Sequence, residues 1–484
     1  MGRKIKKVLL ITPPYHSGVV ESAGTWLNVG FVYIAGSLRA GGYDPVIYDA
    51  MSHWHNYRDI AKRIEEERPD VVATTAITAS INDAIKTLKL AKEINNETVT
   101  IIGNVHPTFC YEEIFKEYST YVDFIVRGEG EETMVELLEC LNAGDSVEKV
   151  RSIVFFRDGK VIATPSRPFI KDIDGLPMAW DLLDWPIYKY KPMEGSTLAI
   201  VSSSRGCSQQ CSFCSQQLFW KRRWRGRSAE YFVNELEHLR DRYGVNVVML
   251  SDETPTLSRS RWEKVLDLLI EREVGVKLLM ETRVADIIRD EDIMWKYREA
   301  GVDHIYVGVE STSQEMLDTF NKNIKAEESK KALELINGYD IVSETSFVLG
   351  MPDDTAEKIR ETVELAKFYS PDLAFFLAIA PWPYSQIYPE LKEYIAVNDY
   401  SKYNLVEPVI RPKHMSLEEV SLELGRASRD FYMYKMDNLD KLSDKKREFM
   451  IKVVRIIATS SYLAKTMKGT MPKEVQGMFE KLRV

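Results

Sequence analysis

The sequence contains little cysteine, no long apolar run and no excess of basic residues, and each shortage excludes a class of protein. Five cysteines in 484 residues are too few, and odd in number, for the disulfide framework of a secreted protein. A membrane-spanning helix needs about 18 consecutive apolar residues, and because no such run occurs we expect a cytoplasmic protein without a membrane span. The formal net charge of −9 argues against a nucleic-acid partner.

What the sequence does contain is a composition suited to large buried cores. Hydrophobic residues make up 45% and charged residues 28% of the chain. At ~150 residues per domain, the length predicts about three domains, or two of which one is large. Residues 1–145 alternate short β-branched runs, beginning with VLLIT at residues 8–12, with amphipathic stretches. This alternation predicts an α/β domain of the Rossmann-like, doubly wound type.

The pattern changes twice beyond residue 145. Residues 146–195 contain two short apolar runs around an Asp-Gly pair, which predict a β-hairpin followed by an ordered linker. Residues 196–395 contain six apolar runs separated by helical stretches, which predict a partial, TIM-like (β/α)6 barrel. Residues 396–484 lose the strand signals and predict a helical C-terminal region. Helices are expected there at residues 416–435 and 445–467.

Three of the five cysteines fall within eight residues, in the segment SSSRGCSQQCSFCSQQ directly after the first predicted barrel strand. Cys207, Cys211 and Cys214 have the spacing C-x3-C-x2-C. Three thiolates on one loop can hold three corners of a [4Fe–4S] cluster and leave one iron open to a small molecule. A closed structural zinc site needs four ligands, and the next histidine, His238, lies well along a predicted helix. The polar residues between the cysteines argue against three buried free thiols.

This spacing, with Phe213 before the third cysteine, resembles the cluster motif of the radical S-adenosylmethionine (SAM) superfamily over residues 196–395. The resemblance implies that SAM binds the open iron and is reductively cleaved to a 5′-deoxyadenosyl radical. Charged side chains at the C-terminal ends of barrel strands can bind the ribose hydroxyls or the methionyl carboxylate. For Arg283 or Glu310 a plain ion pair is the alternative. The resemblance places Phe213, Asp252, Glu253, Glu281, Arg283, Glu310 and Ser311 at the SAM site.

The loops of residues 1–145 resemble those of the cobalamin-binding domains that are fused to one class of radical SAM enzymes. The matching segments are TPPY, WLNVGFVYIAGSLRAGGY, GNVHPT and RGEGEET. Glycines there would let the backbone approach a bulky ligand, and the threonines and a histidine would supply short polar contacts. Ordinary turn chemistry is the alternative for each of them. The residues that the resemblance places at the cobalamin are Pro13, Thr74, Thr75, Thr78, Gly103, His106, Thr108, Gly128, Glu129 and Gly130.

One motif of some cobalamin proteins is absent. These proteins give cobalt a histidine from the sequence D-x-H-x-x-G, but here Asp49 is followed by Met51 and only then by His53. We therefore expect cobalamin to bind without a protein histidine on its lower face, as in this radical SAM class. His106 remains a candidate contact for the cobalamin tail.

Taken together, the resemblances imply a cobalamin-dependent radical SAM methyltransferase that methylates an unactivated sp3 carbon. Its cofactors would be a [4Fe–4S] cluster, SAM and cobalamin. The same layout also resembles the ring-forming anaerobic cyclase of magnesium-protoporphyrin ester, so a cyclase acting on a tetrapyrrole or lipid is the alternative. A non-catalytic cobalamin or iron–sulfur sensor is the alternative of another class. A methylthiotransferase needs a second cysteine trio, and only Cys110 and Cys140 remain.

The sequence says least about the substrate. Its length and its Lys, Glu and Ile usage are similar to those of archaeal enzymes that C-methylate a residue of methyl-coenzyme M reductase, with glutamine as the candidate residue. We therefore expect a peptide, a protein or a small molecule as substrate. The reductive cleavage of SAM also implies an external electron donor of the ferredoxin or flavodoxin type.

Overall fold

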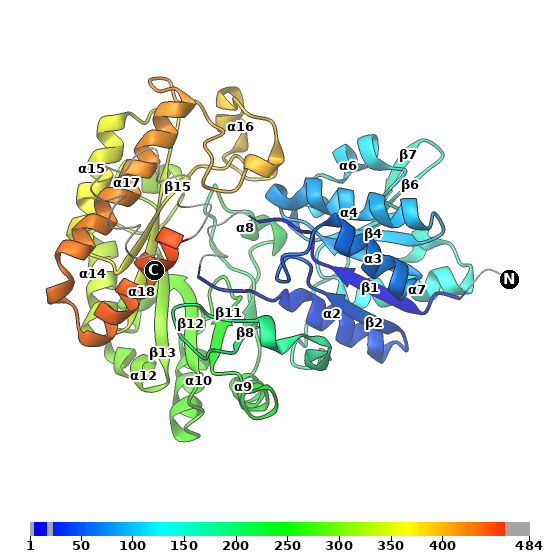
Figure 1. Cartoon of the computed structure of the whole chain (residues 1–484), viewed down its shortest axis with the longest axis horizontal. Coiled ribbons are helices and arrows are strands. Elements are labelled where there is room, and N and C mark those ends of the chain that lie inside the picture. The colour runs from blue at the N-terminus through cyan, green and yellow to red at the C-terminus, as the bar shows by residue number, and fades with distance from the viewer. Residues whose placement is uncertain (1–3, 17–22, 460–484) are drawn as a thin grey trace. The chain divides into compact units, whose positions relative to one another are not determined.

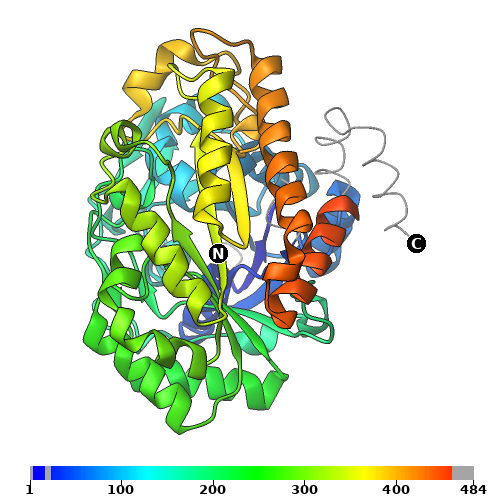
Figure 2. The ribbon, with the colours of Figure 1, turned by 90° about the vertical axis from the view of Figure 1, so that its left-hand side faces the viewer.

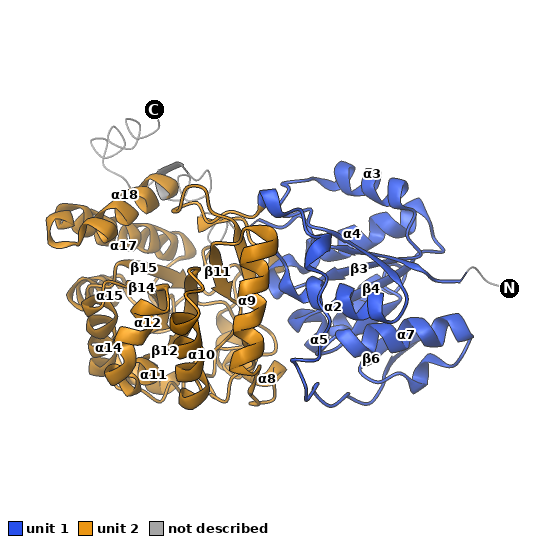
Figure 3. Ribbon diagram, turned by 90° about the horizontal axis from the view of Figure 1, so that it is seen from below, with its two compact units in different colours: residues 1–16, 27–187 blue, residues 17–26, 188–484 orange. Residues whose placement is uncertain are grey.

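A computed structural model of the chain describes residues 4–16 and 23–459. Contacts divide the chain into two compact units, residues 1–16 with 27–187 and residues 17–26 with 188–484 (Figure 3). Each unit is built around one large sheet. Within the described residues, no helix is both long enough and apolar enough to cross a bilayer.

The first unit is a doubly wound α/β domain, as predicted (Figure 1). Its seven-stranded sheet has the order β2-β1-β3-β4-β5-β6-β7, in which β1 to β5 run parallel while β6 and β7 run antiparallel. The strands are β1 (Lys7–Ile11), β2 (Asp44–Tyr48), β3 (Val71–Thr75), β4 (Val99–Gly103), β5 (Phe124–Val126), β6 (Ile153–Arg157) and β7 (Lys160–Ala163). The helices are α2 (Val29–Ala40), α3 (Tyr57–Glu67), α4 (Ile81–Ile94), α5 (Val105–Phe109), α6 (Tyr111–Tyr118) and α7 (Glu131–Ala143).

Local chemistry explains why these segments fold as predicted. The Asn56 side chain accepts a hydrogen bond from the Arg58 amide, and Asp59 accepts one from the Asn56 amide, so the first turn of α3 is capped. The hairpin of β6 and β7 turns at Asp158 and Gly159, whose φ values of 51° and 76° are the positive angles that a tight two-residue turn requires. Because β6 pairs with β5, the hairpin extends the parallel sheet of this unit.

The second unit contains the predicted six-stranded parallel sheet. Its order, β15-β14-β13-β12-β11-β8, places strands that follow one another in the chain side by side, as in an incomplete (β/α)6 barrel. The strands are β8 (Leu198–Val201), β11 (Val247–Leu250), β12 (Lys277–Arg283), β13 (Val302–Gly308), β14 (Val342–Leu349) and β15 (Leu373–Ala378). The helices between them are α8 (Gln216–Phe219), α9 (Ala229–Tyr243), α10 (Arg259–Glu271), α11 (Val284–Arg289), α12 (Met294–Glu299), α13 (Gln314–Thr319), α14 (Ala326–Gly338) and α15 (Ala356–Tyr369).

Helices follow the last strand, as predicted. They are α16 (Tyr388–Leu391), α17 (Leu417–Asp437) and α18 (Asp444–Thr459). Figure 2 shows α17 packed alongside α15, and the Tyr432 hydroxyl of α17 donates a hydrogen bond to the Ala374 carbonyl of β15 at 3.3 Å. In α18 the buried Lys446 donates to Asp372 at 2.6 Å. The part of the predicted second helix from residue 460 to 467 lies outside the described residues.

Candidate functional site

A cavity of about 310 Å³ opens at the C-terminal ends of the strands in the second unit. In parallel α/β sheets this edge is where ligands bind, because the loops that follow the strands converge there. All three clustered cysteines line the cavity, together with charged residues at the end of β12 and after β11 and β13. Its cysteine and polar lining includes Cys207, Cys211, Cys214, Glu253, Thr254, Glu281, Arg283, Tyr306, Glu310, Lys322 and Ser346. Its apolar lining includes Phe213, Val348, Leu377, Ile379, Ala380 and Trp382.

The cysteine loop begins at a glycine that no other residue can replace without rearrangement. Gly206 has φ 92°, and a Cβ atom added to it would lie 2.0 Å from the carbonyl oxygen of Arg223. Its amide donates a hydrogen bond to Glu253 Oε2 at 2.9 Å, and Trp220 Nε1 donates to the other oxygen of this carboxylate at 2.7 Å. Glu253 therefore fixes the start of the loop while it also lines the cavity.

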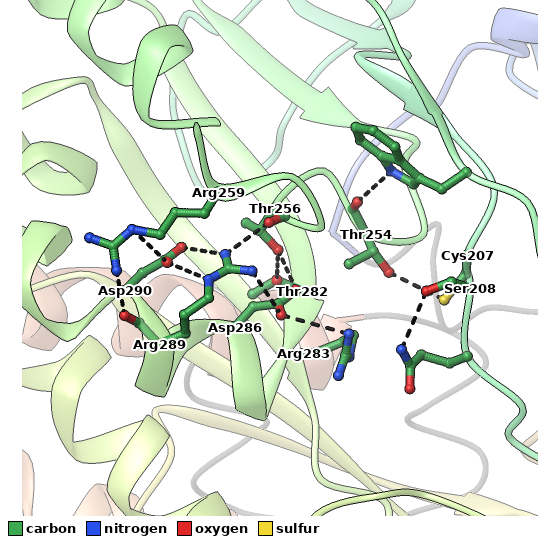
Figure 4. Close-up of polar contacts among 12 residues, drawn as sticks. Cys207, Ser208, Thr254, Thr256, Arg259, Thr282, Arg283, Asp286, Arg289 and Asp290 are labelled. Atoms are coloured by element: carbon green, nitrogen blue, oxygen red, sulfur yellow. Dashed lines mark hydrogen bonds and ion pairs between the residues drawn. The ribbon is translucent and has the colours of Figure 1, made fainter. Parts of the chain in front are cut away.

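Three later segments hold the rest of the loop. The Ser212 amide donates to the Phe320 carbonyl at 2.9 Å, and the Phe213 ring packs edge to face against Phe320 with ring centroids 5.0 Å apart. Gln217 Nε2 donates to the Cys211 carbonyl at 2.7 Å. The Thr254 hydroxyl lies 3.5 Å from Cys207 Sγ, at the distance of a weak hydrogen bond to sulfur (Figure 4). The three thiols are thus displayed on a loop that the surrounding barrel positions.

The donor set fits a [4Fe–4S] cluster. Among residues 4–16 and 23–459, no three Cys, His, Asp or Glu side chains are grouped closely enough to share one metal ion. A cluster does not need such a group, because each cysteine binds a different iron atom. Burial raises the pKa of the Cys214 thiol to about 12 and also raises that of Cys211, which nearby Lys322 partly offsets. Iron binding at these two thiols must therefore be accompanied by proton release.

Acidic groups also crowd the cavity. The Glu281 side chain is exposed where it lines the cavity, and desolvation by the surrounding protein, with repulsion from Glu344, Glu253 and Glu310, raises its pKa to about 7. Glu310 accepts a hydrogen bond from Lys322 Nζ at 2.6 Å and one from the Ser346 hydroxyl at 3.3 Å. Lys322 therefore partly balances the negative charge of these carboxylates.

Arg283 is the cavity residue with the most extensive support behind it. Its guanidinium lies 3.7 Å from Asp286 Oδ1, and Asp286 Oδ2 accepts a hydrogen bond from the buried Thr256 hydroxyl at 2.8 Å (Figure 4). Arg289 lies 3.4 Å from Asp286 and forms two hydrogen bonds with the fully buried Asp290, at 2.7 and 2.8 Å. The network fixes Asp286 and, through it, the charge environment of Arg283.

Two residues predicted to contact SAM do not line the cavity. Asp252 is buried and accepts hydrogen bonds from the Ser203 amide and hydroxyl, both at 2.7 Å, and from the Ser204 hydroxyl. It therefore tethers the segment that leads into the cysteine loop. Ser311 is buried and accepts a hydrogen bond from the Ser313 amide at 3.1 Å, at the start of α13. The other five predicted SAM residues line the cavity together.

The residues predicted to contact cobalamin gather at the C-terminal edge of the first sheet. Thr74 and Thr75 end β3, and Gly103 ends β4. The Thr74 hydroxyl donates to the Ile11 carbonyl at 2.8 Å, Thr75 accepts from Asn104 at 2.9 Å, and the Thr108 hydroxyl accepts from the Gly128 amide at 3.1 Å. Pro13 follows β1 and Gly130 precedes α7, whereas the Glu129 carboxylate accepts the Ile170 amide at 2.8 Å.

His106 is buried at this edge. Its Nδ1 lies 3.2 Å from the Thr78 hydroxyl, and burial lowers its pKa to about 4. The imidazole is therefore neutral near pH 7.

Sequence reasoning missed several polar residues of the cavity, among them Tyr306, Lys322 and Ser346. Tyr306 and Ser346 could have been found, because strand residues two apart share a face, and Tyr306 lies two residues before the cavity glycine Gly308. Lys322 gives no such signal, since it lies in the loop after α13 and meets Glu310 only through the fold.

Comparison with known proteins matches both units to known families. Residues 15–138 match the family described as B12 binding domain, and residues 201–366 match the radical SAM superfamily. An anaerobic magnesium-protoporphyrin IX monomethyl ester cyclase of Rubrivivax gelatinosus is 39% identical over 89% of this chain and 78% of the relative. An uncharacterized methyltransferase of Pyrococcus horikoshii is 32% identical over 89% of this chain and 93% of the relative. The solved structure of the radical SAM methyltransferase TsrM from Kitasatospora setae, with cobalamin and a [4Fe–4S] cluster, shares the fold with a TM-score of 0.72, at 13% identity and with 96% of this chain and all of TsrM covered.

Proposed function

Because the chain belongs to the radical SAM enzymes that carry an N-terminal B12-binding domain, we propose that it is a cobalamin-dependent C-methyltransferase acting on an unactivated sp3 carbon. The cofactors of this family are cobalamin, a [4Fe–4S] cluster and SAM. The observation that carries the proposal is the grouping of three cysteines and a set of charged residues around one cavity, in a chain that also has a B12-binding domain.

When bound, the cluster and SAM supply a 5′-deoxyadenosyl radical, and cobalamin supplies a methyl group. Cys207, Cys211 and Cys214 would hold the cluster. Arg283 would bind the carboxylate of SAM by a charge-assisted hydrogen bond, and Glu310 would accept hydrogen bonds from the ribose hydroxyls.

The remaining walls suit radical chemistry. Leu377, Ile379 and Trp382 form an apolar side of the cavity, which limits the water that could enter beside the reacting groups. With a pKa of about 7, Glu281 can exchange a proton near neutral pH, so it can adapt its charge to the cationic sulfonium of SAM or to a substrate.

A ring-forming cyclase is the second candidate function. It is favoured by the 39% identity to the Rubrivivax cyclase, which exceeds the 32% identity to the Pyrococcus methyltransferase. The share of each relative's length that is matched favours the methyltransferase, because the chain covers 93% of the Pyrococcus relative but 78% of the Rubrivivax cyclase. For the methyltransferase we propose a protein residue as substrate, with a glutamine of methyl-coenzyme M reductase as the candidate, and for the cyclase a tetrapyrrole or lipid.

Anaerobic turnover with SAM carrying a deuterated methyl group tests the proposal. The reconstituted protein is incubated with candidate peptides in one arm and with magnesium-protoporphyrin IX monomethyl ester in the other. A product that gains one trideuteromethyl group supports the methyltransferase. A porphyrin product that forms a new ring without label would establish the cyclase instead. Failure to form 5′-deoxyadenosine in either arm would contradict radical SAM chemistry altogether and favour the non-catalytic sensor.

A further inference from the structure

The segment around the cysteine loop carries a concentration of positive charge that the proposed reaction does not use. Residues 195–229 contain six basic residues and no acidic residue, in a chain that has 64 basic and 73 acidic residues. Arg205 and Arg227 are buried, and Arg225 lies over the Trp220 ring. Lys221, Arg222 and Arg223, here called the basic turn, are consecutive and exposed.

The basic turn is attached directly to the cysteine loop. The Arg222 amide donates a hydrogen bond to the Gln217 carbonyl at 2.9 Å, and the Gln217 side chain in turn donates to the Cys211 carbonyl at 2.7 Å. The Arg223 carbonyl packs against Gly206, the residue before Cys207. The exposed charges therefore belong to the same short structure that displays the thiols to the cavity.

The backbone of the turn is held in an unfavourable conformation. Lys221 and Arg222 have φ values of 50° and 57°, in the left-handed region that residues with a Cβ atom seldom adopt. Two such residues in succession cost free energy. Glycine or asparagine would adopt this turn at lower cost.

The chemistry of the neighbouring cysteine site indicates which kind of partner the positive charges of the basic turn would bind. Resting on the proposed function, a cluster at Cys207, Cys211 and Cys214 must receive an electron from outside this chain before SAM can be cleaved. A protein that brings the electron has to bind briefly and close to the cluster, and such encounters are small, polar and steered by opposite charge.

We propose that the basic turn is the docking surface for an acidic electron-transfer protein that reduces the cluster. In this step one electron leaves the reduced centre of the donor, which is thereby oxidised by one electron, and enters the cluster, which is reduced by one electron. No bond forms or breaks, and no proton has to pass between the two proteins.

The test compares two reductants in the full-length, reconstituted protein. Reduced flavodoxin, an acidic electron-transfer protein, needs a docking surface, whereas dithionite is a small molecule that does not. The measured quantity is the initial rate of 5′-deoxyadenosine formation, at low and at high salt. The variant is Arg222→Glu/Arg223→Glu. The matched control is Lys392→Glu/Lys441→Glu, which reverses the same number of exposed charges elsewhere in the second unit.

We expect the flavodoxin-driven rate of the Arg222→Glu/Arg223→Glu variant to fall at least tenfold at low salt, and its dithionite-driven rate to stay within twofold of the unmodified protein. The flavodoxin-driven rate of the unmodified protein should fall as salt rises, and that of the variant should not. The control should behave as the unmodified protein does.

Four outcomes would overturn the proposal. An equal fall with both reductants would show that the turn supports the site or contacts the substrate. No fall with flavodoxin, or the same fall in the control, would show that electrons enter elsewhere. If the unmodified protein formed no 5′-deoxyadenosine even with dithionite, the proposed function would fail, and the docking surface with it.

Discussion

At the scale of single residues, the five cysteines divide into two chemical groups. Cys207, Cys211 and Cys214 line the cavity, whereas Cys110 and Cys140 belong to the first unit, where burial raises the pKa of both thiols. Only the first three are positioned to bind a cluster.

We therefore expect Cys207→Ala, Cys211→Ala and Cys214→Ala each to lose most of the cluster iron and all 5′-deoxyadenosine formation, because two thiolates do not hold a cluster that leaves one iron free. Iron analysis and the cluster absorption spectrum measure the loss. Cys110→Ala and Cys140→Ala are the controls and should keep their iron. Equal losses in all five variants would contradict the assignment of the site.

His106 makes the stability of the first unit depend on pH. Its pKa falls from 6.5 to about 4 on folding, so the unfolded chain binds a proton more readily than the folded one. The stabilising contribution is complete above pH 6.5 and is lost progressively as the pH falls toward 4. The loss in the free energy of unfolding across this pH range is roughly 3 kcal/mol, at about 1.4 kcal/mol per pKa unit.

The measurement is the urea dependence of hydrogen exchange in peptides from α5 and β4, at pH 7.5 and pH 5. When the pH is lowered from 7.5 to 5, the free energy of unfolding of the unmodified protein should fall by about 2 kcal/mol more than that of His106→Gln. An identical loss in both proteins would show that His106 does not carry this pH dependence.

At the scale of elements, the periodicity of apolar residues predicted the alternation of strands and helices in both units. The six apolar runs of the barrel and the Asp-Gly hairpin fold as expected, because each depends on interactions within a few residues. The cavity could be predicted only in part. Glu281 and Arg283 lie at a strand end and so carry a local signal. The pairing of Glu310 with Lys322, and the use of Asp252 as a tether for Ser203, depend on side-chain contacts formed only after the strands assemble.

The network behind Arg283 leads to a prediction for α11. Asp286 is the only buried carboxylate that Arg283 meets in the ion pairs of the described residues. Replacing it with asparagine removes the charge that orients the guanidinium and keeps the size of the side chain. We expect Asp286→Asn to raise KM for SAM roughly tenfold, about 1.4 kcal/mol, with kcat changed less than threefold and iron content unchanged.

The matched control is Asp292→Asn, since Asp292 is an exposed aspartate that pairs with Arg259 at 2.6 Å and does not meet Arg283. Its KM for SAM should not change. If Asp286→Asn lowered the iron content by as large a factor as it raised KM for SAM, the network would support the fold of the whole site and not Arg283 in particular.

At the scale of the whole molecule, contacts between distant segments had no sequence signal. Residues 23–25 hydrogen-bond to residues 189–191, with Thr25 donating to Lys189 at 2.8 Å and Lys191 donating to Ala23 at 2.9 Å. These residues lie more than 160 positions apart, and such a pairing leaves no periodic pattern in the chain. The C-terminal helices are similar, since their helical character was predictable but their attachment through Lys446 and Asp372 was not.

That attachment predicts a large effect on stability. Lys446 and Asp372 are both buried, and Lys446 also donates to Asn337 at 2.8 Å. Lys446→Met should destabilise the second unit by about 3 to 5 kcal/mol, because it leaves a buried carboxylate without its cation. Urea unfolding measures the change. The exposed Lys441→Met is the control, and Lys446→Met/Asp372→Asn should recover most of the loss. If Lys446→Met were as stable as Lys441→Met, the proposed role of the Lys446–Asp372 pair would be wrong.

The position of the cysteine loop directly after β8 has a consequence for how the protein is made. The ribosome synthesises all three cysteines within eight residues of one another. The last residue that lines the cavity, Leu405, is synthesised 191 residues after Cys214. At about 5 to 20 residues per second, the nascent chain carries the thiols without their completed surroundings for roughly 10 to 40 seconds. Exposed thiols oxidise more readily than enclosed ones. We therefore expect oxygen present during translation to reduce the fraction of chains that can later accept a cluster, even when purification and reconstitution are strictly anaerobic.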